Sequence, residues 1–314
     1  MDASAADPVL VIKLGALGDF IQALGPLAAI RRHHPASRIT LLTTAPFVDF
    51  AKASGYADEV WCDEKPSALA MVKWLKLRKH LRLGGFGRVY DLQTSDRSAI
   101  YYRLFWPGPI PEWSGSVTGS SFSHTNPGRD SMHTIERQAE QLRMAGIENV
   151  RLADVSWATA DIARFGLADW FALLVPGGAI HRPGKRWPQS CYGELAEAFL
   201  AREIQPVLLG VEDEAWLLRD IAASSAGAVN LAGRTDLMDI AELSRRAVAA
   251  VGNDTGPMHL IAAAGCPCIV LYSHESDPAL CAQRGAAVSI LRRQSLDQLS
   301  VDEVLTKADA LIAA

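Results

Sequence analysis

Short runs of apolar residues alternate with longer segments of helical periodicity along most of the chain. Runs such as Val9–Leu14 and Phe171–Val175 have the length of buried strands, and amphipathic segments such as 68–83 and 190–202 have the length of helices. This alternation is typical of βαβ units, in which helices connect parallel strands and cover the sheet. The sequence therefore predicts an α/β protein built on parallel sheets.

The alternation pauses once and then begins again. Residues 150–168 carry no strong periodic signal, and the 314 residues amount to about twice a common domain length. We therefore expect two Rossmann-like domains with doubly wound parallel sheets, the first over residues 1–155 and the second over residues 156–314.

One stretch of the first half, residues 106–130, does not fit the alternation. It holds four prolines and four glycines among serines and threonines. Such a composition predicts a long irregular loop without regular elements, and a loop of this length in a compact domain is usually functional or disordered. Helical periodicity returns over residues 131–145.

Composition and charge exclude several classes of protein. Hydrophobic residues make up 49% and charged residues 21%, which is ordinary globular usage. The net charge of −4 gives no cationic excess for a nucleic-acid partner. Residues 1–155 nevertheless hold 18 Lys and Arg against 16 Asp and Glu, whereas the rest holds 13 against 19, so the first half suits an anionic partner better.

Cysteine usage and hydropathy indicate the compartment. The five cysteines are scattered and show no zinc-ligand spacing, as expected of reduced thiols in a reducing compartment. No apolar run approaches the roughly 18 residues of a membrane-spanning helix, and the first residues lack the basic start of a signal peptide. We therefore expect a soluble cytoplasmic protein.

The first loop that could bind a ligand or take part in catalysis, Lys13–Asp19, lies between the first strand and the first helix. Gly15 and Gly18 allow a ligand to approach the backbone closely, and a helix start at the carboxyl edge of a parallel sheet favours an anion. Asp19 could serve a ligand there or simply cap the helix. The spacing is neither the dinucleotide fingerprint nor a P-loop, so the alternatives stay open.

The second loop follows the first strand of the second half. Three glycines, among them Gly177 and Gly178, precede Lys185 and the next helix. A lysine is a compact point charge that suits a diphosphate, so this loop is a candidate phosphate site. A solvated basic loop is the alternative.

The third loop, Gly252–Leu260, again joins a strand to a helix. A capped, buried helix start explains Gly256 and Pro257. It does not explain why Asp254 and His259 both lie at the edge where ligands bind. The exposed amides of Thr255 and Gly256 would face an anion, which makes this loop the most specific local signal.

These loops, in this order, resemble glycosyltransferase family 9, the lipopolysaccharide heptosyltransferase family. The blocks Lys185-Arg-Trp-Pro188 and Asp254–Leu260 carry the resemblance, and Tyr90–Gln93, Arg137–Gly146, 209–214 and 231–237 support it by position. The resemblance implies a GT-B fold, with an acceptor-side domain and a nucleotide-sugar domain facing across a cleft. It also implies an inverting glycosyltransferase that moves a heptose-like sugar from ADP-heptose to a lipopolysaccharide core acceptor of the lipid A and Kdo type.

The resemblance also implies roles for single residues. Asp19 matches the general base that takes the proton of the acceptor hydroxyl, and Lys185 matches the lysine on the donor diphosphate. Glu214 matches the acidic residue on the nucleotide ribose, although the spacing also allows Glu212. The expected donor site comprises Gly15, Gly18, Lys185, Glu214, Asp254, Thr255, Gly256 and His259.

We expect neither a metal nor a resident cofactor. A lysine and helix amides can stabilise the charge of a leaving diphosphate without a cation. The sequence also contains no Asp-x-Asp, the pair that bridges a metal in other glycosyltransferases. The nucleotide sugar would be a co-substrate.

Acceptors of this family are anionic lipid-linked saccharides at the inner membrane. Arg97 and Arg103 are therefore expected to bind acceptor phosphates or carboxylates. The basic residues of 73–88 alternate with apolar ones, so this helix could lie against anionic headgroups on the cytoplasmic face of the membrane. A solvated helix with an ordinary buried stripe explains the pattern equally well.

Two departures and two other functions remain open. Residues 181–183 lengthen the approach to Lys185, and the segment 106–130 has no counterpart in the family, which leaves the donor sugar and the acceptor less defined. A nucleotide-sugar isomerase on the same fold would need an acid and base pair but no acceptor. A non-catalytic nucleotide-binding module of envelope assembly would bind nucleotide without turnover.

Overall fold

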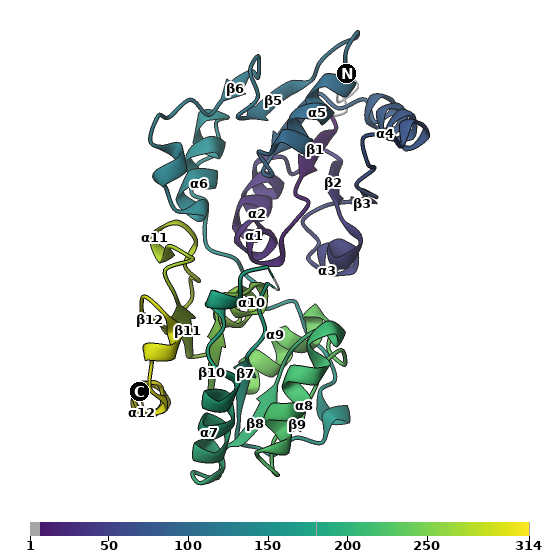
Figure 1. Ribbon diagram of the computed structural model, residues 1–314. Coiled ribbons are helices and arrows are strands. Elements are labelled where there is room, and N and C mark those ends of the chain that lie inside the picture. Colours follow the sequence, from purple (N-terminus) through teal and green to yellow (C-terminus); the bar gives the residue numbers. More distant parts are fainter. Residues whose placement is uncertain (1–6, 180, 314) are drawn as a thin grey trace. The chain divides into compact units, whose positions relative to one another are not determined.

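The computed structural model describes residues 7–179 and 181–313. The chain divides into two units between Ala153 and Asp154. In the described residues each unit contains one six-stranded sheet, all of whose strands pair in parallel, with helices packed around it (Figure 1). The predicted α/β class with two doubly wound parallel sheets is confirmed.

The sheet of unit 1 has the strand order β3-β2-β1-β4-β5-β6. Its strands are β1 Val9–Ile12, β2 Ile39–Thr43, β3 Glu59–Cys62, β4 Arg88–Asp91, β5 Glu112–Gly115 and β6 Phe122–Ser123. Its helices are α1 Leu17–Gln22, α2 Leu24–His33, α3 Val48–Ala53, α4 Met71–Leu83, α5 Asp96–Leu104 and α6 Thr134–Met144. The order reverses between β1 and β4, so this unit has its switch point at the carboxyl ends of those strands.

The sheet of unit 2 has the order β12-β11-β10-β7-β8-β9, which repeats the connectivity of unit 1. Its strands are β7 Phe171–Val175, β8 Gln205–Leu208, β9 Val229–Asn230, β10 Ala249–Asn253, β11 Cys268–Tyr272 and β12 Val288–Arg292. Its helices are α7 Gln189–Leu200, α8 Ala215–Ala223, α9 Leu237–Arg246, α10 Gly256–Ala263, α11 Pro278–Cys281 and α12 Val301–Ile312. The switch point lies between β7 and β10.

The central strands are buried on both faces. Every residue of β1, β7, β10 and β11 is buried, which explains why these segments read as continuous apolar runs rather than as alternating ones. Polar groups in such strands are tolerated only where the strand ends and the loop begins, so ligand chemistry is confined to the carboxyl edges.

Residues 20–33, whose apolar side chains recur at helical spacing and predict one helix, belong to two helices. Helix α1 ends at Gln22 and α2 begins at Leu24, with Ala23 between them. Pro26 has no N–H with which to continue the hydrogen bonds of α1, but it is tolerated in the first turn of a new helix. The proline therefore explains why α1 ends and α2 begins at this point.

The prediction that residues 106–130 form no regular element was wrong. Strand β5 pairs with β4, and β6 extends the sheet beyond it. Three of the four prolines precede β5 and the fourth, Pro127, follows β6, so none interrupts a strand, and Trp113 buries its ring in the core. Helix α5 and strand β12 also lie in segments for which the sequence predicted no element.

Gly25 lies where α2 touches the chain near the end of unit 1. A Cβ on Gly25 would lie 1.9 Å from the backbone oxygen of Arg151. We predict that Gly25→Ala lowers the free energy of unfolding by about 3 kcal/mol, because backbone on both sides must shift. Chemical denaturation measures this loss. Gly128→Ala is the matched control, since its Cβ would meet nothing closer than 3.4 Å; an equal effect of both variants would contradict the packing argument.

Candidate active site

Asn253, the last residue of β10, holds together the loops at the carboxyl edge of the unit 2 sheet. Its Oδ1 accepts hydrogen bonds from the backbone N–H of Trp187 at 3.0 Å and from the hydroxyl of Tyr192 at 3.1 Å. Its Nδ2 donates to the carbonyl oxygens of Pro176 at 2.8 Å and Gly177 at 3.1 Å. The buried amide thus uses both acceptor and both donor positions, which fixes the loops after β7 and β10 against each other.

The predicted donor residues Lys185 and Asp254 form an ion pair. The Nζ of Lys185 lies 2.6 Å from Oδ2 of Asp254, while Oδ1 of Asp254 accepts from the side-chain amide of Gln283 at 3.1 Å. Burial on its own would raise the pKa of Asp254, but hydrogen bonds from Lys185, Ser276 and Gln283 and the charge of Lys185 hold it below its ordinary value. The carboxylate is therefore charged, and it positions the Lys185 ammonium.

The N-terminus of α10 adjoins this ion pair in the chain. Thr255 is the N-cap residue but its side chain makes no capping bond, and its buried Oγ1 has no hydrogen-bond partner among the described residues. The first N–H groups of a helix also lack intrahelical partners and attract anions. A Cβ on Gly178 would lie 3.7 Å from Cγ2 of Thr255, which is van der Waals contact, so the second loop lies beside the start of α10.

The structure thus brings four of the predicted donor residues together in unit 2. We call Lys185, Asp254, Thr255 and Gly256 the diphosphate site, after the ligand that the sequence predicts there. They offer an ammonium group, a hydroxyl without a hydrogen-bond partner among the described residues, and the first amides of a helix at one edge of the sheet. His259 lies one turn further along α10 and is buried.

The two glutamates considered for the ribose differ in their surroundings. Glu214 accepts hydrogen bonds from the backbone N–H of Gly178 at 2.9 Å and of Val211 at 3.2 Å. Its carboxylate lies where a Cβ on Gly177 would be, so a side chain at that position would displace Glu214. Glu212 is exposed and lies beside Gly233 instead. Of the two, only Glu214 is tied to the loop that leads to Lys185.

Gly15, Gly18 and Asp19 lie in unit 1, where the Lys13–Asp19 loop joins β1 to α1. Gly15 has a φ of +114°, and a Cβ there would lie 2.7 Å from the Phe47 ring, so no other residue fits without strain. Gly18 is buried within α1, and Asp19 follows it half-buried in the first turn. The Asp19 side chain makes no capping bond to this helix, so the simple capping interpretation does not explain it.

Two further charges lie around this loop. Lys13, at the end of β1, is buried and donates to the carbonyl oxygen of Leu92 at 3.2 Å. Burial lowers the pKa of Lys13, and the charges of Asp19 and Asp91 oppose that shift. Burial raises the pKa of Asp91 to about 6, against hydrogen bonds from the backbone N–H groups of Thr94 and Gln93. Sequence reasoning placed Lys13 in the loop but assigned it no role.

An arginine pair near Asp19 was missed. Arg129 and Arg137 are half-buried and repel each other, and burial together with the charge of Arg129 lowers the pKa of Arg137. The charge of Asp19 acts in the opposite sense on Arg137. Arg129 donates to the hydroxyl of Thr94 at 2.7 Å, while its buried Nε has no partner in the described residues. The signal lay in the sequence, because the two arginines flank the start of the 134–144 helix.

Arg97 and Arg103, which were predicted to bind the acceptor, lie in different surroundings. Arg97 donates to the carbonyl oxygen of Pro66 at 3.2 Å and lies over the Trp74 ring, 5.7 Å from its centroid. Arg103 is exposed near the end of α5, about two helical turns further from the sheet edge. Their role toward the acceptor stays a prediction. Within residues 7–179 and 181–313, no group of three or more His, Cys, Asp or Glu is arranged to hold a metal ion.

The four hydrogen bonds of Asn253 generate a direct test. We predict that Asn253→Asp lowers the free energy of unfolding at pH 7 by about 3 kcal/mol, because a carboxylate oxygen would replace the amide that donates to Pro176 and Gly177. Burial and those carbonyl oxygens should raise the pKa of the new carboxyl. The loss should therefore shrink as the pH falls and the carboxyl takes up a proton.

Denaturant titrations between about pH 5 and 8 measure both effects. Asn230→Asp is the matched control, because the Asn230 side chain only accepts, from the backbone N–H of Ala232 at 2.9 Å. If Asn253→Asp were as stable as the control at pH 7, the hydrogen bonds of Asn253 would not be what holds the loops after β7 and β10 together.

Comparison with known proteins places the chain in a family. The sequence profile of Glycosyltransferase family 9 (heptosyltransferase) matches residues 74–298. Lipooligosaccharide heptosyltransferase 2 of Haemophilus influenzae is 35% identical over 104 residues, 32% of this chain and 30% of that protein. Its counterpart in Haemophilus ducreyi is 30% identical over 160 residues, 43% of this chain and 46% of that protein. The aligned segments span less than half the length of these curated relatives.

Solved structures show the same fold over almost the whole chain. The ADP-heptose LPS heptosyltransferase II of E. coli aligns with a TM-score of 0.82 at 23% identity, covering 98% of both chains. The E. coli heptosyltransferase WaaC with ADP aligns with a TM-score of 0.77 at 21% identity, covering 97% of this chain and 99% of that one. The expected GT-B type of fold is confirmed. With the profile spanning more than half of its residues, the chain belongs to glycosyltransferase family 9, the heptosyltransferase family.

Proposed function

We propose that this protein is an inverting glycosyltransferase that moves a heptose from ADP-heptose to a lipopolysaccharide core acceptor, with neither metal nor resident cofactor. Membership of the heptosyltransferase family supports the reaction class. The binding of ADP and of an ADP-heptose analogue by WaaC supports the donor. The observation that carries the proposal is the diphosphate site, where the Lys185 ammonium and the unpaired Thr255 hydroxyl adjoin the N-terminus of α10.

The diphosphate site suits a leaving group that gains negative charge. When the bond between the anomeric carbon and the diphosphate oxygen breaks, its electron pair goes to that oxygen. Lys185 and the amides of Thr255 and Gly256 provide fixed positive potential where this charge develops. Asp254 would face the hydroxyls of the donor sugar while holding Lys185, and His259 would lie toward the phosphates. Glu214 would accept from the ribose hydroxyls, with Glu212 as the alternative.

Asp19 is the proposed general base. Its carboxylate takes the proton of the acceptor hydroxyl as that oxygen forms the new bond to the anomeric carbon. Attack on the face opposite the diphosphate inverts the configuration. The backbone at Gly15 and Gly18 can approach the donor closely because neither residue carries a side chain. Lys13 and Arg137 both interact electrostatically with the Asp19 carboxylate, so positive charge lies around the proposed base.

The arginine pair is the proposed site for an anionic group of the acceptor. Arg129 and Arg137 carry like charges in a half-buried position, which an entering phosphate or carboxylate would neutralise. Arg97 and Arg103 are proposed to contact the acceptor further out. A lipid-linked acceptor also sets the location, because the protein must then work peripherally at the cytoplasmic face of the inner membrane.

Removal of the proposed base should separate chemistry from binding. We predict that Asp19→Asn lowers the rate of heptose transfer by about a thousandfold, since general base catalysis contributes between about 10² and 10⁴. The affinity for ADP should stay within about twofold of the wild type, because the diphosphate site is untouched. Transfer to a deacylated core acceptor gives the rate, and titration calorimetry gives the affinity.

Asp96→Asn is the matched control, because Asp96 is exposed in the first turn of α5 at the same sheet edge. Full transfer by Asp19→Asn would remove the base assignment. Conversion of ADP-heptose without any acceptor into an isomeric nucleotide sugar would favour the isomerase, and ADP binding without turnover of any acceptor would favour a binding module.

The arginine pair predicts an effect confined to the acceptor. Arg137→Gln should raise the KM for a phosphorylated core acceptor by about tenfold or more, because a hydrogen bond to a charged group is lost. The KM for ADP-heptose should not change. Arg143→Gln on the exposed side of the same helix is the control. An increase confined to the donor KM would contradict the assignment.

A further inference from the structure

Helix α4 carries apolar side chains on two opposite sides. Trp74, Leu77 and Leu81 face inward and pack against the core of unit 1. The opposite side carries a second set, which we call the outer stripe: Leu69 just before the helix, then Met71, Val72, Leu75 and Leu83. These five side chains are between 58% and 94% exposed. An ordinary surface helix has one apolar stripe and a polar opposite face, so packing in unit 1 does not account for the outer stripe.

The same helix is strongly cationic. It holds five Lys and Arg residues, namely Lys73, Lys76, Arg78, Lys79 and Arg82, and no Asp or Glu. Lys79 lies on the line of the outer stripe, between Leu75 and Leu83 at helical spacing, and Lys76 and Arg82 flank it. Lys76 and Lys79 form no ion pair with another described residue. A segment that is both apolar and uncompensated in charge has the composition of a helix that lies at an anionic interface.

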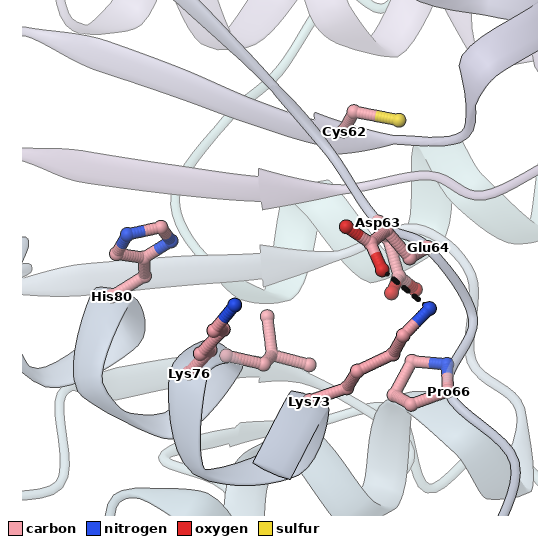
Figure 2. Close-up of a pocket in the computed structure, with 8 residues that line it drawn as sticks. Cys62, Asp63, Glu64, Pro66, Lys73, Lys76 and His80 are labelled. Atoms are coloured by element: carbon pink, nitrogen blue, oxygen red, sulfur yellow. Dashed lines mark ion pairs between the residues drawn. The ribbon is translucent and has the colours of Figure 1, made fainter. Parts of the chain in front are cut away.

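The cavity beside α4 does not explain these cations. About 440 Å³ in volume, it lies between α4 and the carboxyl end of β3, and Lys73, Lys76 and His80 line one side of it on successive turns (Figure 2). The opposite side carries Asp63 and Glu64, and Glu64 pairs with Lys73 at 2.8 Å. This pair neutralises Lys73, whereas Lys76, Lys79 and Arg82 form no ion pair with another described residue. The unbalanced positive charge of the helix therefore includes that of these three residues.

We propose that α4 is a membrane-docking helix, which lays its outer stripe into the headgroup region of an anionic lipid bilayer while Lys76, Lys79 and Arg82 contact lipid phosphates. Apolar burial and attraction to acidic headgroups add together in this arrangement. A second copy of the chain is the less favourable occupant, because a symmetric contact would set five cations against five cations without a carboxylate on either helix. In the described residues no helix is long and apolar enough to cross a membrane.

Docking through α4 would bring the bilayer close to the edge of the sheet that carries Asp19. The first turn of α4 lies beside the carboxyl end of β3, because Lys73 pairs with Glu64 two residues beyond that strand, and this end is at the same sheet edge as the loop that carries Asp19. A bilayer on the outer stripe would hold a lipid-linked acceptor near that edge. The choice of an acceptor in the bilayer rests on the proposed function, but the docking itself does not, so the two can fail separately.

Vesicle co-sedimentation of the full-length protein tests the proposal. Vesicles of phosphatidylcholine alone are compared with vesicles that contain about one third phosphatidylglycerol. We expect binding to the anionic vesicles that falls as salt is added, and at least tenfold weaker binding to the neutral ones. The double substitution Val72→Glu with Leu75→Glu should lower the partition coefficient on anionic vesicles by about tenfold or more.

Two further variants separate the electrostatic contribution to vesicle binding from the effect of adding a carboxylate. Lys76→Glu with Lys79→Glu should abolish the preference for anionic vesicles, because it reverses two of the uncompensated charges. Met144→Glu is the control for an added carboxylate, since Met144 is 41% exposed on another helix of the same unit. Transfer of heptose to a deacylated, soluble acceptor should be equal in all these variants and the wild type, which also shows that they are folded.

The contradicting results are distinct. Equal binding of the wild type and Val72→Glu with Leu75→Glu to anionic vesicles would overturn the proposal, as would equal binding of the wild type to neutral vesicles. A concentration-dependent dimer in solution that this double variant abolishes would assign the outer stripe to a second copy and not to lipid. Vesicle binding as expected without transfer to any acceptor would instead contradict the proposed function and leave the docking intact.

Discussion

The buried side chain of Asn253 is the constraint on which the unit 2 site depends. A primary amide at the end of β10 satisfies a backbone amide, a hydroxyl and two carbonyl oxygens at once. The loop after β7 and the loop after β10 therefore have one arrangement, because losing any of these bonds leaves a buried polar group unpaired. The position of Lys185 follows from that arrangement. The backbone of nearby Trp187 is bound by Asn253, and the Lys185 ammonium is bound by Asp254.

Both units use the same order of strands, and each therefore exposes its chemistry at the carboxyl edge next to a switch point. The charges placed there differ. Unit 1 sets Asp19 among the positive charges of Lys13 and Arg137, which suits a base and an anionic acceptor. Unit 2 sets Lys185 on Asp254 beside the amides of α10, which suits a leaving diphosphate. One fold, repeated, thus provides two complementary sites.

Elements with a strong local pattern could be predicted from the sequence, whereas those that depend on distant contacts could not. β7 was predicted at its observed bounds because a doubly covered strand must be continuously apolar. β5 was missed because only pairing with β4 makes a proline-flanked segment a strand. Lys185 and Asp254 were recognised through their loops. The roles of Asn253 and of Arg129 with Arg137 depend on partners far along the chain, and short-range spacing carries no such information.

Lys185 and the N-terminus of α10 are proposed to form the site for the donor diphosphate. A crystal structure of the full-length protein with ADP tests it most directly. We expect the β-phosphate within hydrogen-bond distance of the Lys185 ammonium and of the Thr255 hydroxyl, which has no protein partner in the described residues. ADP bound elsewhere, with Thr255 still without a partner and Lys185 bound to Asp254 alone, would contradict it.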